Sequence, residues 1–186
     1  MKLINATNHI LGVLGEATVT TTQIQHPTVA SILETIDMEK DSFLENGLWF
    51  NTREVKMYPN ESGVIEVPTN ALFIRDIEKD NNLYVERSGG LYDVTADSSV
   101  FTEPVDLEII YNLDFEDLPE SVARAIMYNA AYIKYVSEFG VDNTAKQEQQ
   151  FALKAEASVK KQNLKSRKYN SNRNKSFYRI TSFIKG

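Results

Sequence analysis

The sequence contains no cysteine and only two histidines, which excludes disulfides and thiolate metal sites. His9 and His26 have no second histidine at ligand spacing, so we expect neither to bind a metal. The nucleophile pattern GxSxG and the phosphate-loop patterns GxxxxGK(S/T) and GxGxxG are also absent. The sequence therefore predicts no cofactor and offers no argument for serine–histidine catalysis.

Long apolar runs are missing as well. No segment reaches the roughly 18 apolar residues of a membrane span, and the opening MKLINATNHILGVLG lacks the small-residue cleavage site of a signal peptide. The 186 residues, 42% of them hydrophobic, suit one domain or a core with a small insertion. We expect a soluble protein made in the cytosol.

Acidic residues are absent from the end of the chain. Nine Lys and Arg and no Asp or Glu lie between Lys160 and Gly186, so residues 1–159 hold the other 11 bases and all 26 acids. The two parts therefore carry formal charges of +9 and −15, within a net charge of −6. Such an asymmetry indicates that the basic segment has a partner of its own.

Three interpretations of this basic segment are open. It is a solvated terminus, or it binds nucleic acid through counterion release and base stacking by Tyr169 and other aromatics, or it orders against a protein. Electrostatic binding does not require apolar side chains, whereas strand addition or helix docking onto an acidic, grooved protein does. Five such side chains favour the protein partner: Phe177, Tyr178, Ile180, Phe183 and Ile184.

Two helices are predicted near the start of the chain. The first is NATNHILGVLGE, with Asn5 as its N-cap and Gly15 at its end. After a threonine-rich stretch that is predicted to be extended or a loop, the second opens at Pro27 and stops at Gly47. A predicted β region follows, because short segments rich in β-branched and aromatic residues alternate with turn signals. Their connections are too short for crossover helices, so we expect four or five antiparallel strands, with the Gly89-Gly90 pair in a hairpin turn.

Helical periodicity returns in FEDLPESVARAIMYNAAYIKYVSEFG, with apolar residues on two opposite sides. One stripe contains Val122, Ile126, Ala130 and Ile133. A helix that is apolar on both sides is buried on both sides. It is therefore either a central helix of its own bundle or one whose second stripe meets a neighbouring subunit, the stripe formed by Tyr128, Tyr132, Tyr135 and Phe139.

Acids cluster where this helix starts, in DFEDLPE, at Asp114, Glu116, Asp117 and Glu120. Such a group suits a glycosidase pair or a Mg²⁺ site. Acids at a helix N-terminus also offset the positive end of the helix dipole, and this simpler explanation is favoured. A last helix, predicted over 141–167, has a narrow seam of small residues and pairs antiparallel with its predecessor.

Five motifs stand out along the chain: ATNHILGVLGEATVTT, GLWFN, YPNESGVIEVPTNAL, LYVERSGGLYDV and FEDLPESVARAI. Together they resemble the tail tubular protein A family, the head–tail adaptors of short-tailed phages, in the family's order and at about its spacing. They cover roughly residues 6–139. KQEQQ replaces an acidic stretch of the family's last helix, and the basic segment is the part that matches least.

The resemblance implies a structural virion protein, made in the host bacterial cytoplasm, and not an enzyme. Family members form a dodecameric ring between the portal protein and a tail nozzle of the tail tubular protein B kind, and DNA passes through the lumen. The implied subunit interface uses the aromatic stripe named above. The implied portal interface comprises Arg167, Lys168, Tyr169, Arg173, Phe177, Tyr178, Arg179, Ile180, Phe183 and Ile184.

We therefore expect an α+β protein with a bundle of about four helices, a small antiparallel β insertion and an extended C-terminal arm. The expected parts are 1–47 and 114–166 for the bundle, 48–113 for the insertion and 167–186 for the arm. Two alternatives stay open: a nucleic-acid-binding protein that uses the basic tail, and a wall-degrading enzyme that uses Glu116 or Glu120.

Overall fold

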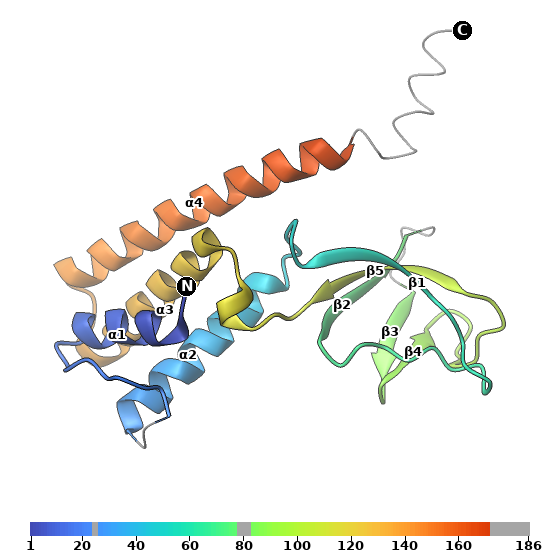
Figure 1. Ribbon diagram of the computed structural model, residues 1–186, viewed down its shortest axis with the longest axis horizontal. Coiled ribbons are helices and arrows are strands. Elements are labelled where there is room, and N and C mark those ends of the chain that lie inside the picture. Colours follow the sequence, from blue (N-terminus) through green and yellow to red (C-terminus); the bar gives the residue numbers. More distant parts are fainter. Residues whose placement is uncertain (24–25, 78–82, 172–186) are drawn as a thin grey trace, which may run out of the picture. The chain divides into compact units, whose positions relative to one another are not determined.

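The computed structural model describes residues 1–23, 26–77 and 83–171, with side chains as far as residue 166 in the last helix. The α+β class predicted from the sequence is confirmed, with four α-helices and antiparallel strands (Figure 1). The elements are α1 (Leu3–Val13), α2 (Pro27–Leu44), β1 (Thr52–Met57), β2 (Ala71–Asp76), β3 (Tyr84–Arg87), β4 (Gly90–Asp93), β5 (Val105–Tyr111), a 3₁₀ turn (Phe115–Asp117), α3 (Glu120–Phe139) and α4 (Asn143–Ser171).

The chain divides into two compact units, which we call the helical unit (1–39 with 115–186) and the β unit (40–114). The division falls at Lys40, inside α2. Helix α4 runs through residue 167, where the sequence placed the start of the arm, and its backbone stays helical to Ser171. The functional boundaries expected from the sequence stay predictions.

The core of the helical unit draws on all four helices. Each of them presents a small apolar stripe at helical spacing to the interior, and these stripes are fully or almost fully buried. Their members include Ala6, Ile10, Val29, Ile32, Ile36, Val122, Ile126, Ala130, Ala145, Ala152 and Val159. The predicted stripe of α3 fails at Ile133, which is 40% exposed, because the last turns of α3 bury Ala131 and Lys134 instead.

The ends of α1 show one correct and one wrong prediction. Asn5 is not the N-cap, because α1 begins two residues earlier, at Leu3. The N–H of Leu3 is satisfied from far away, by Oε1 of Glu116 at 3.1 Å. At the other end, the N–H groups of Gly15 and Glu16 bond back to the carbonyls of Gly12 and Leu11, which is a Schellman ending as the sequence indicated.

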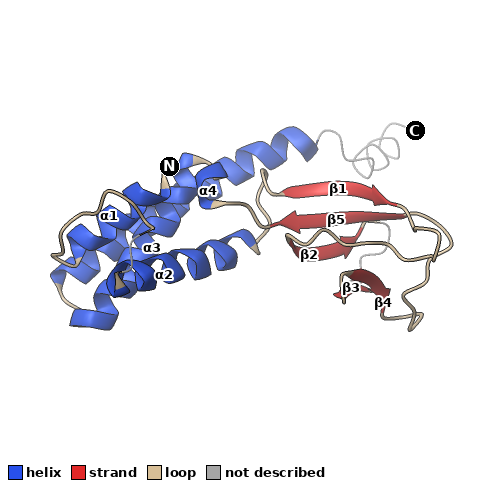
Figure 2. Ribbon diagram, turned by 60° about the horizontal axis from the view of Figure 1, so that its bottom comes forward, coloured by secondary structure: helices blue, strands red, loops and turns tan. Residues whose placement is uncertain are grey.

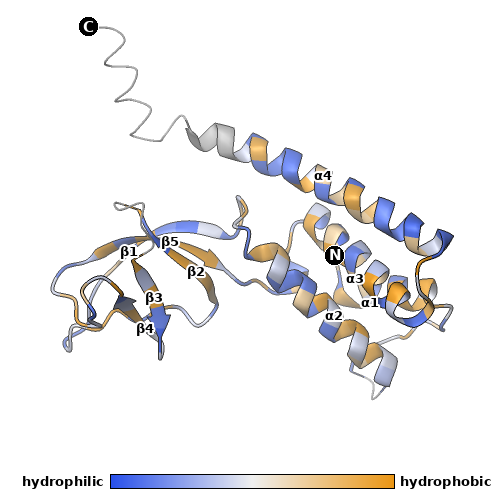
Figure 3. Ribbon diagram, turned by 180° about the vertical axis from the view of Figure 1, so that it is seen from behind, coloured by the Kyte–Doolittle hydropathy of each residue, from blue (hydrophilic) through white to orange (hydrophobic). Residues whose placement is uncertain are grey.

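Helices α3 and α4 form an antiparallel hairpin (Figure 2). Asp142 caps α4, since its Oδ1 accepts the N–H of Ala145 at 2.9 Å. Ala145, Ala152 and Val159 recur every seven residues and are buried, so small side chains let the two helices approach closely. The rest of α4 is mostly hydrophilic, as its colouring in Figure 3 shows.

The β unit contains a three-stranded antiparallel sheet in the order β1-β5-β2 and a separate β3-β4 hairpin. In the central strand β5, Leu107 and Ile109 point to one side and are fully buried. They belong to one buried core to which both sheets contribute. Its members are Ile65, Val67, Ile74, Tyr84, Leu91, Leu107 and Ile109. The prediction of four or five antiparallel strands is confirmed.

The predicted hairpin turn exists, but its central residues are Ser88 and Gly89, with φ of 53° and 81°. Gly90 already belongs to β4 and has no positive φ. A Cβ at Gly90 would lie 3.3 Å from Cγ1 of Val64, so this second glycine permits close packing rather than a turn.

The GLWFN motif builds the connection from α2 to β1. Gly47 has φ of +62°, and a Cβ there would lie 2.7 Å from Cδ1 of Ile110. Asn51 is 1% exposed. Its Oδ1 accepts the N–H of Leu48 at 2.7 Å, and its Nδ2 donates to the carbonyls of Leu44 and Tyr111, each at 3.0 Å. One buried amide therefore joins the helix end, the turn and the last strand.

Candidate interaction surfaces

The aromatic stripe of α3 divides into an inner and an outer part. Tyr128 is half-buried between two other helices, with ring centroids 5.3 Å from His9 of α1 and 5.4 Å from Phe151 of α4. Beside it, Nε2 of His9 lies 3.3 Å from Oε2 of the buried Glu148. Tyr128 thus belongs to a contact that joins α1, α3 and α4 within one chain.

The outer part of the stripe, toward the end of α3, is largely exposed only at Phe139. Tyr132 is half-buried, and Phe139 is 59% exposed, its ring centroid 5.0 Å from that of Tyr135. The hydroxyl of Tyr135 donates to Oδ2 of Asp142 at 2.7 Å. The hydrogen bonds that Asp142 accepts, first from the N–H of Ala145 and then from Tyr135, hold the pKa of its carboxyl below the usual value.

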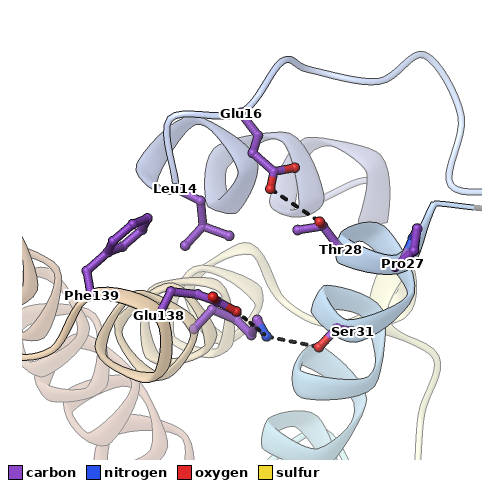
Figure 4. Close-up of a pocket in the computed structure, with 8 residues that line it drawn as sticks. Leu14, Glu16, Pro27, Thr28, Ser31, Glu138 and Phe139 are labelled. Carbon is purple, nitrogen blue, oxygen red and sulfur yellow. Dashed lines mark hydrogen bonds and ion pairs between the residues drawn. The ribbon is translucent and has the colours of Figure 1, made fainter.

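A pocket of about 310 Å³ lies where the ends of α1 and α3 meet the start of α2 (Figure 4). The ammonium group of the buried Lys134 donates to Oγ of Ser31 at 2.9 Å and lies 3.9 Å from Oε1 of Glu138. Glu16 stands on the opposite wall, and its Oε1 accepts from the hydroxyl of Thr28 at 3.2 Å. Two carboxylates beside one ammonium leave no excess positive charge, so the pocket does not suit a phosphate group.

Two of the four carboxylates of DFEDLPE, Glu116 and Glu120, have structural partners, whereas Asp114 and Asp117 are exposed. Glu116 accepts the N–H of Leu3, and Oε2 of Glu120 lies 3.2 Å from the amino group of Met1. Hydrogen bonds from that amino group and then from Arg124 hold the pKa of Glu120 below its usual value. These contacts fix the start of α1, and the lowered pKa of Glu120 does not suit a general acid, which needs a raised pKa.

The described residues contain neither a metal-binding cluster nor a membrane span. In residues 1–23, 26–77 and 83–171, no group of three or more His, Asp or Glu side chains is placed to hold a metal ion. In the same part of the chain, no helix combines the length and the apolar character that crossing a membrane requires.

The predicted portal-interface residues fall into two sets. Arg167, Lys168 and Tyr169 continue the backbone of α4, and nothing further is described of their side chains. The others lie outside the described residues: Arg173, Phe177, Tyr178, Arg179, Ile180, Phe183 and Ile184.

The exposed side of α4 was not singled out from the sequence. Between 143 and 166, every exposed charged residue is a lysine, and the two acids turn inward. Glu148 is buried beside His9, and the half-buried Glu156 accepts from Nδ2 of Asn129 at 2.9 Å. The signal was present in the sequence, because the predicted seam of small residues orients α4 and leaves the lysines on its other sides.

Comparison with known proteins places the chain in a family. A family model described as "Tail tubular protein" matches residues 4–169. The chain belongs to the tail tubular protein family, whose members are structural proteins of phage tails. Within it, the chain is 30% identical over 181 residues to Tail tubular protein A of Klebsiella phage KP34, covering 97% of this chain and 96% of that protein. The resemblance drawn from the five motifs is confirmed.

Proposed function

We propose that this protein is a head–tail adaptor that joins the portal to the tail nozzle. It belongs to a family of tail proteins, and the observation that carries the proposal is the continuity of positive charge. The lysines on the outer side of α4 lead without a break in the helix to Arg167 and Lys168, and then to the bases of 172–186. The chain as a whole is acidic, but this segment is basic and carries apolar side chains. It therefore suits a partner with an acidic surface and apolar grooves.

The proposed mechanism is assembly. Residues 167–186 order on the portal, where their bases meet acids and their apolar side chains enter pockets. The β unit contacts the nozzle or a neighbouring subunit. Neighbouring copies close a ring, to which the outer part of the aromatic stripe contributes through Tyr132, Tyr135 and Phe139. Tyr128 already has two aromatic partners within its own chain, so its expected share is smaller.

DNA passes through the proposed ring without sequence-specific contact. Residues 1–159 carry 26 acids against 11 bases. An acidic wall repels phosphate, which favours passage over retention.

Two variants of the full chain separate a protein partner from DNA. The apolar variant replaces Phe177, Tyr178, Ile180, Phe183 and Ile184 by Ser and keeps every base. The charge variant replaces Arg173, Lys175, Arg179 and Lys185 by Gln and keeps the apolar residues. Binding to purified portal rings is measured by co-sedimentation, and binding to duplex DNA by salt titration.

Adaptor function predicts that the apolar variant loses portal binding while its far-ultraviolet circular dichroism stays unchanged. Removal of residues 172–186, which contain all five of these apolar side chains, should have the same effect on portal binding. A different result would support the nucleic-acid alternative: tight, salt-steep DNA binding that survives in the apolar variant and is lost in the charge variant. Portal binding that all three altered chains retain would refute the assigned role of the segment.

A further inference from the structure

The outer face of α4 combines positive charge with exposed apolar residues. Leu153 and Leu164 are 58% and 63% exposed. They are 11 residues apart, or about three turns, so they lie on one side of the helix with the exposed Ala157 between them. Exposed lysines surround this line at 146, 154, 160, 161 and 165. Ala152 and Val159, on the opposite side of α4, form the seam with α3.

The outer face of α2 within the helical unit has the opposite charge. Val29, Ile32 and Ile36 point into the core. On the opposite side lie four exposed residues, of which two are acids and one is a large apolar side chain: Ala30, Glu34, Asp37 and Met38, the last 67% exposed. Residues 30–39 contain no base. This face therefore matches the outer face of α4 in both charge and apolar character.

The two faces lie on different sides of the helical unit, because α3 lies between α2 and α4 (Figures 1 and 2). A contact between two copies of the same face would place like charges opposite each other, which is unfavourable. A contact between different faces pairs opposite charges, and it leaves one face of each type free for a further copy. Such a heterologous contact generates a ring when its rotation closes.

We propose that the α4 face of one copy (Leu153, Ala157, Leu164 and the surrounding lysines) packs on the α2 face of the next copy (Ala30, Glu34, Asp37 and Met38). This inference rests on the proposed ring and names the partner of each face, a second copy of this chain. Leu153 and Leu164 pack against Met38 and Ala30, and lysines pair with Glu34 and Asp37. Each exposed ion pair contributes little to the free energy of binding. The charges therefore mainly set the register of the contact and determine which face meets which.

Charge reversal tests the pairing directly. Variant A carries Lys154→Glu and Lys161→Glu, and variant B carries Ala30→Lys and Glu34→Lys. All four positions are exposed, so the folds should persist, which circular dichroism checks. A control carries Asp117→Lys, at an exposed acid of the helical unit that lies in neither face. Assembly of each chain with purified portal rings is followed by native mass spectrometry and sedimentation.

In variant A, the two new glutamates face Glu34 and Asp37 at every contact, and in variant B, the two new lysines face the lysines of α4. Each alone should form at least about tenfold less ring than the wild type, whereas the control should assemble normally. An equimolar mixture should regain assembly, because A and B alternate around the ring and every contact again pairs opposite charges. A chain with all four substitutions should also assemble.

The outcomes separate the pairing from the proposed function. Normal ring assembly by both A and B overturns the pairing and leaves adaptor function intact. A second outcome is that mixing A and B does not restore assembly and that A alone has lost DNA binding. This result assigns the α4 face to nucleic acid and also overturns the pairing. A wild-type chain that forms no ring with or without portal refutes the proposed function itself.

Discussion

Asn51 shows how a single side chain holds the β unit together. Its amide makes three hydrogen bonds to backbone groups, of which those to Leu48 and Leu44 are buried and that to Tyr111 is partly buried. Leucine has nearly the same volume but neither donor nor acceptor, so its presence would leave these backbone groups unpaired. Each buried polar group without a partner costs roughly 1–3 kcal/mol, whereas the hydrogen bond itself contributes less.

We therefore predict that Asn51→Leu lowers the free energy of unfolding by on the order of 3 kcal/mol. Chemical denaturation followed by tryptophan fluorescence measures this, since Trp49 lies in the same GLWFN motif. The matched control is Asn46→Leu, at an exposed asparagine whose Nδ2 donates to the carbonyls of Ser42 and Phe43. A loss for Asn51→Leu no larger than that of the control would contradict the structural role of this amide.

At the scale of elements, the α3–α4 hairpin depends on the charge of Asp142. Because its pKa is lowered in the folded chain, the ionised form is favoured by folding. The stabilisation is fully present above the ordinary pKa of an aspartate, about 4, and it is lost as pH falls through the lower folded pKa. Asparagine retains an acceptor for the N–H of Ala145 but has no charge to titrate.

We predict that Asp142→Asn has a lower melting temperature than the wild type at pH 7. The difference should shrink from about pH 4 downward and disappear below the folded pKa. Thermal unfolding between pH 2.5 and 7 measures it. Tyr135→Phe, which removes one of the two hydrogen bonds that Asp142 accepts, should show a smaller version of the same trend. A pH-independent difference would show that Asp142 acts only as a neutral cap.

Element ends were predictable where the signal is local. Pro27 opens α2 and Gly15 ends α1, because both residues act through their own backbone geometry. The start of α1 was not predictable, since its partner Glu116 is 113 residues away. The contact of His9 with Glu148 spans 139 residues, so the role of Tyr128 within the chain was equally hidden. Periodicity identifies an apolar or charged face, but it does not identify what covers that face.

At the scale of the whole molecule, the two units have separate cores. Leu107 is fully buried with the residues that join the two sheets of the β unit, and Ile126 is fully buried in α3 of the helical unit. Truncating a fully buried Leu or Ile to Ala removes about 2–5 kcal/mol of stability from its own core. Effects at distant sites without shared partners are additive and stay local.

We predict that Leu107→Ala lowers hydrogen-exchange protection in β1, β2 and β5 and leaves α3 and α4 almost unchanged. Ile126→Ala is the matched reciprocal change, and it should lower protection in α3 and α4 while the strands keep theirs. Exchange measured by mass spectrometry on the full chain resolves both. Equal loss of protection in both units from either change would show one cooperative core, and the helical unit could not then move as a separate body during ring assembly. Local effects would instead let the helical unit make its contacts while the β unit adjusts to its own partner.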